Sequence, residues 1–410
     1  MATFLEQFDA LDTPGRAALT QQYLAQKPNE LFAELRANRP ILTTPIGVLV
    51  SKADDVRSVL SRGNELTVKL YAVKMERITG PFMLGMQDSA RYRREAALLR
   101  VTFPDPEITD LTGRFATMVH EQLQPARATG RIDIVSQLTR AVPTRFVQEF
   151  YGVPGPSADS LQRWARTIFH DIFINLGNDA AVRENADASA AEMIPYLDEL
   201  IAAREKSPTG GDTVLERLLR MRDAAETSLT PEVIRHNLIG MIVGTIDTTS
   251  KAAAYAVDWL LSNDTAREQA MTANASLFTR YVLEAMRFAP QANILTRLCE
   301  TRTDLAVGKA WQTTVAPGTI IFAGIGSAMF DPESIPDPDE FRADRVDSMY
   351  FHFGHGQHSC FGRYINPIQI CEMIRGVLLL PNLRRAAGPD GTLQQEGPFP
   401  SKLVVECDPE

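Results

Sequence analysis

The spacing of apolar and polar residues predicts long helices in the second half of the chain. The amphipathic stretch 277–288 predicts a helix that ends before Ala289-Pro290, because proline rarely continues a helix. A longer segment begins at Thr230-Pro231, which has the pattern of an N-cap followed by proline at the first helical position, and runs to Leu261. The apolar run 364–380 predicts a third helix.

Short strands are predicted between the helix at 277–288 and the helix at 364–380. Residues 293–298 alternate in polarity enough to form one strand, and residues 320–323 form another after a tight turn at Pro317-Gly318. The proline-rich stretch 330–341 follows and is incompatible with regular helix. We therefore expect a mainly α fold with a small β portion, an α+β class.

Composition supports a single large folded unit. The 410 residues are 44% hydrophobic and 23% charged, ordinary values for a globular protein with a sizeable core, and no linker or low-complexity tract divides them. The net charge of −9 argues against nucleic acid as a partner, because phosphate binding needs a basic surface. Neither a targeting sequence nor an apolar run of about eighteen residues is recognisable, so we expect a cytoplasmic protein without a membrane span.

One cysteine lies in a setting that suggests a metal ligand. Cys360 belongs to the glycine-rich segment 353–362, just before the third predicted helix. A structural zinc site would need four N or S ligands at short, paired spacings, and Cys299, Cys371 and Cys407 are isolated. Haem iron needs one protein ligand, and an axial thiolate favours O–O bond cleavage. Taken alone, a buried structural cysteine would still be the commoner explanation.

The neighbours of this cysteine suit a haem ligand. Gly354 and Gly362 would let the backbone approach a flat macrocycle, and Phe353 would shield the sulfur from water. His358 would bind a haem propionate. The whole segment has the pattern Phe-x-x-Gly-x-His-x-Cys-x-Gly, and in this it resembles the haem-binding loop of the cytochrome P-450 family.

The resemblance implies a fold, a cofactor and a domain organisation. It implies one cytochrome P-450 domain over residues 1–410, with a helical bulk and a small β-rich portion built from the N-terminal and 292–325 segments. Haem b would lie between a long central helix and the cysteine loop. Cys360 would be the axial ligand of its iron.

A second motif of the family lies upstream in the expected order. Glu284 and Arg287 resemble the family's Glu-x-x-Arg pair, which braces the haem loop together with a later arginine. Arg342 and Arg345 are both candidates for that arginine. An exposed ion pair at this spacing would contribute only about 0.2–0.5 kcal/mol, whereas a buried network would be needed for the fold.

The middle of the predicted helix 230–261 contains an acid and an alcohol, Asp247 and Thr248, in an otherwise apolar surface. From the residues alone, a solvated Asp beside a Thr bonded to a carbonyl one turn back is an equally good explanation. By resemblance, this pair delivers protons to dioxygen and Gly244 lies beside the haem. Thr245 stands where the family usually has glycine. The resemblance therefore does not imply how wide the groove for oxygen is beside this helix.

Two further residues are assigned to the haem by resemblance. Arg297, in the predicted strand 293–298, would pair with a propionate, and the alternative is a surface charge. Tyr92 stands where many bacterial members have histidine, and its hydroxyl can bind a carboxylate. Ala96 takes the place of the family's clamping arginine. The residues leave open which neighbour replaces that arginine: Arg93, Arg94 or Arg100.

Substrate contacts are expected from apolar or aromatic residues in segments that match the family's pocket. Any one of them is more often part of a core than of a pocket. The candidates are Phe82, Phe173, Ile294, Leu295 and Phe399.

The expected function is that of a haem-thiolate monooxygenase. It would insert one atom of dioxygen into a small apolar organic molecule, in secondary or catabolic metabolism, with electrons from a ferredoxin-type or flavin-containing donor. A peroxygenase that uses hydrogen peroxide and a non-catalytic, gas-binding haem protein are the alternatives. Asp247 and Thr248 disfavour both, because neither alternative needs a proton relay. The sequence does not indicate the identity of the substrate.

Overall fold

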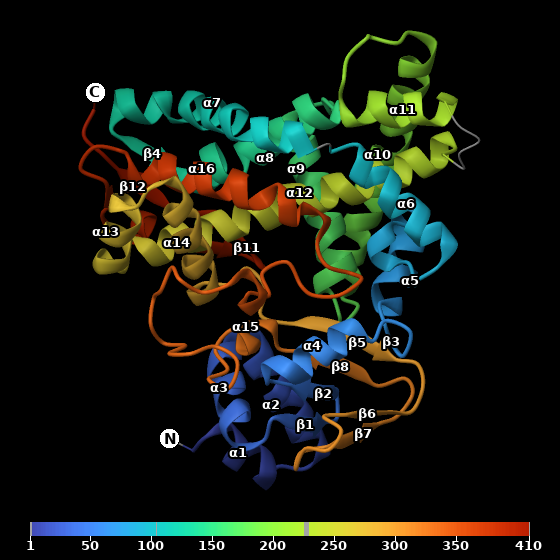
Figure 1. Ribbon diagram of the computed structural model, residues 1–410, viewed down its shortest axis with the longest axis vertical. Helices are drawn as coiled ribbons and strands as arrows, with labels where there is room; N and C mark the ends of the chain where they lie inside the picture. Colours follow the sequence, from blue (N-terminus) through green and yellow to red (C-terminus); the bar gives the residue numbers. More distant parts are fainter. Residues whose placement is uncertain (1, 104, 225–228, 410) are drawn as a thin grey trace. The chain divides into compact units, whose positions relative to one another are not determined.

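The chain folds into two compact units in the computed structural model, which describes residues 2–103, 105–224 and 229–409 (Figure 1). The first unit comprises Met1–Leu70, Met86–Asp88 and Pro290–Phe361, and the second comprises Tyr71–Gly85, Ser89–Ala289 and Gly362–Glu410. Helices take up about 60% of the chain and strands about 10%. The expected class, mainly α with a small β portion, is therefore confirmed. The expectation of one domain over residues 1–410 stays a prediction.

A five-stranded sheet with the order β1-β2-β8-β5-β3 lies in the first unit. β2 and β8 are parallel, with Val48 opposite Ile321, and the other neighbours are antiparallel. The predicted strands at 293–298 and 320–323 correspond to β5 and β8. The strands of the first unit are β1 (Ile41–Thr44), β2 (Gly47–Val50), β3 (Leu66–Thr67), β5 (Leu295–Cys299), β8 (Ile320–Ala323) and the separate pair β6 (Thr303–Leu305) and β7 (Thr313–Val315).

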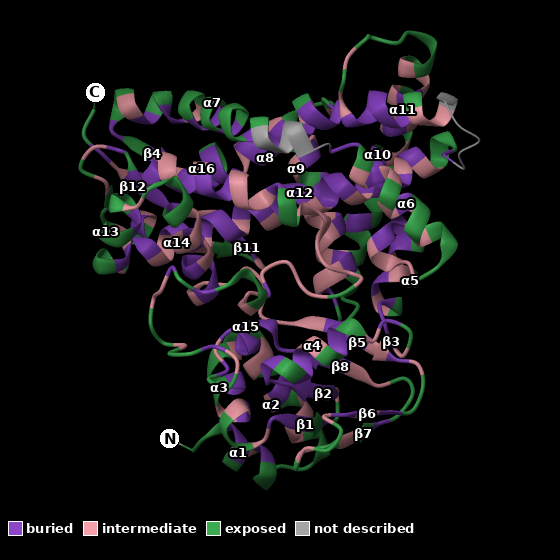
Figure 2. Cartoon of the chain, viewed as in Figure 1, coloured by how far each residue is buried: buried purple, intermediate pink, exposed green. Residues whose placement is uncertain are grey.

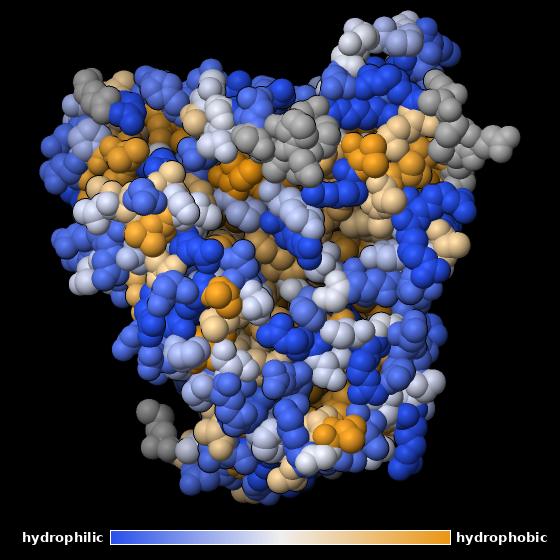
Figure 3. Space-filling view, viewed as in Figure 1, coloured by the Kyte–Doolittle hydropathy of each residue, from blue (hydrophilic) through white to orange (hydrophobic). Residues whose placement is uncertain are grey.

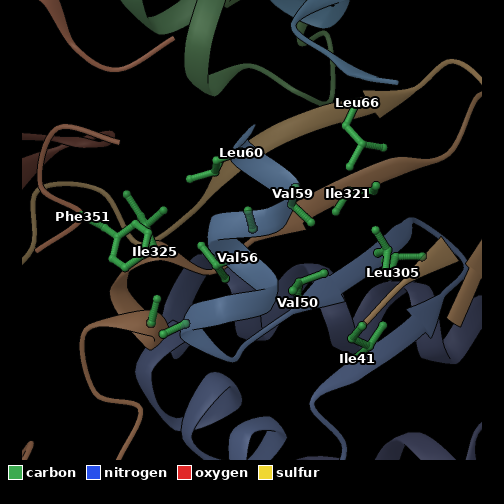
Figure 4. Close-up of a cluster of buried hydrophobic side chains, with 14 of the residues drawn as sticks. Ile41, Val50, Val56, Val59, Leu60, Leu66, Leu305, Ile321, Ile325 and Phe351 are labelled. Atoms are coloured by element: carbon green, nitrogen blue, oxygen red, sulfur yellow. The ribbon is translucent and has the colours of Figure 1, made fainter. Parts of the chain in front are cut away.

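Helix α4 packs on this sheet. Its side chains Val56 and Leu60 are buried together with Val50 and Ile321 in a hydrophobic cluster (Figure 4). The proline-rich residues 330–341 contain no helix, as predicted, and they contain no strand either. The helices of the first unit are α1 (Phe4–Ala10), α2 (Thr13–Gln26), α3 (Pro28–Asn38), α4 (Ala53–Ser61), α15 (Ile325–Ala328) and the short η5 (Asp347–Met349).

The second unit is built mainly of helices, with α5 belonging to it from its third residue onward. Its α-helices are α5 (Lys69–Ile78), α6 (Ala90–Val101), α7 (Asp105–Thr129), α8 (Ala141–Phe146), α9 (Ala158–Phe169), α10 (Ala180–Lys206), α11 (Val214–Ala224), α12 (Pro231–Leu260), α13 (Asp264–Thr272), α14 (Ala275–Phe288) and α16 (Asn366–Leu378). Its short helical segments are η1 (Met83–Gly85), η2 (Val135–Thr139), η3 (Val147–Tyr151), η4 (His170–Ile174), η7 (Gly388–Gly391) and, from its second residue onward, η6 (Phe361–Tyr364).

The long helix α12 packs against α9, α14 and α16. Buried residues recur along almost all of its length, as Figure 2 shows. Thr230 is its N-cap and accepts a hydrogen bond from the backbone N–H of Val233, with Pro231 at the first helical position. All three predicted helices are present, although α16 begins at Asn366 after a turn of 3-10 helix.

Two small sheets complete the second unit. One has the order β4-β12-β9, and the other is a hairpin of β10 and β11 in which Glu396 lies opposite Phe399. On the face seen in Figure 3 the surface is mostly hydrophilic, with smaller hydrophobic areas. Among the described residues, no helix combines the length and apolar character needed to cross a membrane. The strands are β4 (Arg131–Asp133), β9 (Arg384–Arg385), β10 (Gln394–Glu396), β11 (Phe399–Lys402) and β12 (Val404–Glu406).

Candidate functional site

The cysteine loop of the first unit is closed by its own backbone. The N–H of Cys360 donates to the carbonyl of Phe353 over 2.8 Å. Gly354 and Gly356 have φ of 70° and 73°, in the left-handed region that glycine adopts without strain. A Cβ on Gly356 would lie 2.7 Å from the carbonyl oxygen of Leu60, so this part of the loop lies against the end of α4. Both positions therefore require glycine.

The four cysteines differ in how far they are buried. Cys360 is half-buried, whereas Cys299, Cys371 and Cys407 are buried. Burial raises the pKa of Cys371 to about 12 and also raises the pKa of Cys299. These buried thiols are poorly suited to become thiolates, so Cys360 is the best placed of the four to act as a ligand.

Arg297 and His358 bring two nitrogen-bearing side chains to the same region of the first unit. Arg297 lies in β5 with only 2% of its surface exposed, and its Nη1 donates to the carbonyl of Thr296 over 2.9 Å. Burial, together with the positive charge of Arg297, lowers the pKa of His358 to about 4. A buried guanidinium beside a neutral imidazole can bind a carboxylate through charge and N–H donors. The structure thus excludes a surface location for Arg297.

In the second unit, Gly244 and Thr248 lie one turn apart on α12. Both are half-buried, whereas most residues around them are buried. The hydroxyl of Thr248 donates to the carbonyl of Gly244 over 2.5 Å. A Cβ added at Gly244 would meet no described atom within 4 Å. The middle of α12 therefore borders open space on the face that carries the Thr248 hydroxyl.

Thr245 points in a different direction from Gly244. Its hydroxyl donates to the carbonyl of Met241 over 2.7 Å and shares a 2.8 Å hydrogen bond with the hydroxyl of Tyr151 in η3. Successive residues of an α-helix are rotated by about 100°. The side chain that replaces the family's usual glycine consequently faces η3, and the space at Gly244 stays open.

Asp247 is buried and held at one of its two oxygens. Arg166 of α9 donates to Oδ1 from Nη2 at 2.8 Å and from Nε at 3.2 Å, and Nε of Arg140 lies 3.6 Å from the same atom. No donor in the described part of the chain reaches Oδ2. Burial raises the pKa of Asp247 to about 6, and the charge of Arg166 opposes this shift. The structure therefore excludes a solvated aspartate.

Sequence reasoning missed these two arginines. Arg166 is 81 residues from Asp247, and no periodicity links them. The one available signal was the cost of burying a carboxylate in the middle of a helix, which demands a cationic partner from somewhere in the fold.

Glu284 and Arg287 form a fully buried pair on α14. Arg287 donates to Glu284 through two parallel bonds, Nε to Oε1 and Nη2 to Oε2, each of 2.9 Å. Of the two later arginines in the first unit, Arg342 is partly exposed and pairs with Asp344. Arg345 is buried and donates to backbone carbonyls of residues 336–340. The exposed-pair explanation for Glu284 and Arg287 is therefore wrong.

Tyr92 is half-buried in the first turn of α6, whose N-cap is Ser89. Of the arginines that follow it, Arg100 stacks on the ring of Tyr364, with 3.9 Å from the guanidinium carbon to the ring centroid. Arg93 and Arg94 are exposed. Arg100 is thereby placed beside η6, the turn that follows the cysteine.

The predicted substrate residues fall in both units. In the second unit, Phe173 packs on Phe169 with ring centroids 4.7 Å apart, and Phe169 lies 6.3 Å from Phe399. Phe82 packs against α12, since a Cβ on Gly240 would lie 2.3 Å from its ring. In the first unit, Leu295 lies beside Gly354 and Ile294 packs at the edge of a hydrophobic cluster.

Comparisons with known proteins agree with this fold. A model of the cytochrome P-450 family matches residues 20–373. The chain is 26% identical over 377 residues to the mycinamicin IV hydroxylase/epoxidase of Micromonospora griseorubida, covering 86% of this chain and 88% of that protein. It is 25% identical over 364 residues to the pentalenolactone synthase of Streptomyces exfoliatus, covering 85% and 86%.

Solved structures of the same fold match nearly the whole chain. The structure of CalO2 gives a TM-score of 0.81 at 21% identity, with 94% of this chain and 97% of that one covered. The structure of P-450BioI in complex with an acyl carrier protein ligated to hexadec-9Z-enoic acid also gives 0.81, at 19% identity, with 94% and 99% covered.

The family model covers well over half of the chain, and the relatives match most of its length. The expected family, its fold and its cofactor, haem b, are thereby confirmed. The chain belongs to the cytochrome P-450 family and is a haem-thiolate monooxygenase, an oxidoreductase that uses dioxygen and electrons from a redox partner.

Proposed function

We propose that Cys360 is the axial ligand of the haem iron. The observation that carries this proposal is that Cys360 is the accessible one of four cysteines, in a loop whose glycines and backbone hydrogen bonds fix its position. When bound, haem with an axial thiolate supplies the activation of dioxygen. The residues that would surround it are those assigned by resemblance: Arg297, His358, Tyr92, Phe353, Gly354, Gly362 and Gly244.

The residues present fit such a group. The guanidinium of Arg297 is buried and lies near the His358 ring, and propionates are anions that this pair would bind. Gly244 would leave room for a ring to approach α12, since a Cβ added there would meet no described atom within 4 Å. Gly362 supports a close approach of the chain, since a Cβ there would lie 2.9 Å from the side chain of Asn366.

Asp247 and Thr248 would supply protons for the reaction. Insertion of one oxygen atom converts R–H, O₂, two electrons and two protons into R–OH and water, so two protons must reach the oxygen. The Thr248 hydroxyl borders the open space and is fixed by the Gly244 carbonyl. The pKa of Asp247, raised to about 6 by burial, suits a group that gains and releases a proton near neutral pH.

The substrate would be a small apolar organic molecule. The residues proposed to contact it are Phe82, Phe173, Ile294, Leu295 and Phe399, which offer aromatic and aliphatic surface and no charge. Peroxygenase activity and non-catalytic haem binding are less well supported, because neither uses the Asp247–Thr248 arrangement.

The electron donor would be a ferredoxin-type or flavin-containing protein with an acidic docking face. Arg93 and Arg94 are exposed on α6, and Arg100 and Arg363 both stack on Tyr364. A steered encounter with an acidic protein would slow as ionic strength rises. A reduction rate independent of salt would contradict this docking. We also propose a cytoplasmic location, because all four cysteines are free.

An optical spectrum of the reduced protein with carbon monoxide tests the ligand. Thiolate ligation shifts the main haem band strongly to the red relative to histidine ligation. We expect this shift in the unmodified protein and in Cys371→Ala, which removes a buried thiol, and its loss in Cys360→Ser. A shifted band that survives Cys360→Ser would overturn the assignment.

A further inference from the structure

Arg166 joins two carboxylates that lie on different elements of the second unit. Its Nη2 donates to Oδ1 of Asp247 on α12, and its Nη1 donates to Oε2 of Glu396 at the end of β10, each over 2.8 Å. Two anions therefore share one guanidinium. Whatever moves Glu396 relative to Arg166 also changes the combined electrostatic effect of these two charges on Asp247.

The β10–β11 hairpin contacts both arginines that reach Asp247. The guanidinium of Arg166 lies over the ring of Phe399 at 5.1 Å from its centroid. Nη2 of Arg140 donates to the carbonyl of Pro400 over 3.3 Å. The same hairpin thus positions Arg166 through a carboxylate and a ring, and Arg140 through a backbone carbonyl.

Asp247, Arg166 and Glu396 form an ionic chain, and its three side chains differ strongly in exposure. The side chain of Asp247 is 2% exposed, that of Arg166 17% and that of Glu396 73%. Asp247 is fixed within the packed helix α12, whereas Glu396 lies at the turn of a two-stranded hairpin. Glu396, the exposed member of the three, can therefore move without disturbing the core.

We propose that the β10–β11 hairpin controls the charge state of Asp247, with Arg166 and Glu396 as positioning residues for proton delivery. With Glu396 in place, its negative charge offsets part of the effect of the Arg166 charge on Asp247, and Asp247 gains a proton more readily. Without Glu396, the effect of the guanidinium is no longer offset, and Asp247 stays an anion down to lower pH. The inference rests on the proposed role of Asp247 as a proton donor.

The electrostatics around Asp247 have the sign that this inference requires. The charge of Glu396 raises the pKa of Asp247, and the charge and hydrogen bonds of Arg166 lower it. In the described part of the chain, the charged groups that face Asp247 are Arg166 from α9, Arg140 from the junction of η2 and α8, and Glu396 from β10. Removal of Glu396 should therefore shift the titration of Asp247 to lower pH.

The test is the pH dependence of product formed per electron consumed by the haem-loaded enzyme, together with the pH dependence of the free energy of unfolding, which reports the pKa of Asp247 independently of the reaction. This yield should fall as Asp247 loses its proton, with a midpoint near its pKa of about 6. In Glu396→Gln the midpoint should fall by roughly half a pH unit, because an exposed pair contributes little. Glu121→Gln is the control. Glu121 lies on α7 and is an exposed partner of Arg145, and its replacement should leave the midpoint unchanged.

A double-mutant cycle separates positioning from direct charge repulsion. Arg166→Gln alone should move the midpoint to higher pH, since Asp247 loses its main cation. Glu396→Gln should then have a smaller effect in the Arg166→Gln background, because Arg166 no longer holds Glu396 in place. An equal shift in both backgrounds, or none in Glu396→Gln alone, would overturn the inference. If Asp247→Asn itself left the product yield unchanged, the proposed function of Asp247 would fail instead.

Discussion

Arg287 and Glu284 are joined by two parallel hydrogen bonds of 2.9 Å, and neither side chain has any exposed surface. Desolvating two charges is costly, and their mutual attraction repays that cost only when the geometry is good and both partners remain. The pair is therefore one to which the fold is sensitive, in contrast to the ion pairs on the surface.

Glu284→Gln should destabilise the protein by about 3–5 kcal/mol, because it removes the carboxylate charge that forms two hydrogen bonds with the buried Arg287 guanidinium. Loss of haem should accompany the loss of stability. Urea unfolding and haem content of the purified variant measure the two effects. Arg342→Gln, which removes a cation that pairs with exposed carboxylates, should change both only slightly. A stable Glu284→Gln variant with full haem content would contradict the structural role.

Thr248 and Thr249 are adjacent threonines of α12 with different surroundings. Thr248→Val should retain haem and substrate binding but reduce product per electron by roughly tenfold or more, since a proton-transfer group is lost. Hydrogen peroxide should account for the missing electrons. The measurement compares product, peroxide and reductant consumed in the same reaction.

Thr249→Val is the matched control. The Thr249 side chain is buried, and its hydroxyl has no hydrogen-bond partner in the described ranges of the chain. Replacing that hydroxyl with a methyl group should leave the product yield unchanged and raise the free energy of unfolding by up to about 1 kcal/mol. Equal uncoupling in both variants would mean that packing of α12, and not the Thr248 hydroxyl, is what matters.

Much of the fold could be predicted because the signals were local. The N-cap and proline at Thr230-Pro231 mark the start of α12, and the turn at Pro317-Gly318 precedes β8 as expected. The direction of Thr245 was also within reach, since helical periodicity separates it from the face of Gly244 and Thr248.

The ionic chain at Asp247 could not be predicted in the same way. Glu396 and Arg166 are 230 residues apart, and the hairpin that carries Glu396 reaches α9 only in the folded chain. Local patterns specify elements and their buried faces, but the partner of a buried charge is decided by packing between distant elements. The accessibility of Cys360 likewise depends on how the folded loop packs against the distant helix α4.

Asp247→Asn should change the pH dependence of stability. Burial raises the pKa of Asp247 from 3.8 to about 6, so the folded protein binds this proton more tightly than the unfolded chain does. The free energy of unfolding of the unmodified protein must then fall as pH rises through that window. Asparagine does not ionise, so the free energy of unfolding of Asp247→Asn does not decrease in this way. Relative to Asp247→Asn, the unmodified protein should lose up to about 3 kcal/mol between the two pKa values and nothing further above them.

Urea unfolding of both proteins over that pH range measures the difference. Asp9→Asn is a control whose effect has the opposite sign and lies at lower pH, below about 3.8, because the hydrogen bond from Arg39 lowers the pKa of Asp9. A difference between Asp247→Asn and the unmodified protein that does not depend on pH would show that the carboxyl is not perturbed by burial.

Thr245 is one of the residues that depart from the family's pattern. Thr245→Gly should reduce the free energy of unfolding by about 2 kcal/mol, from lost hydrogen bonds and from glycine inside a helix. Product per electron should stay the same, because the Thr245 hydroxyl faces Tyr151 and not the space at Gly244. Tyr151→Phe should cost about 1 kcal/mol and likewise leave the yield unchanged. A changed yield in Thr245→Gly with an unchanged yield in Tyr151→Phe would mean that Thr245 shapes the groove beside Gly244 after all.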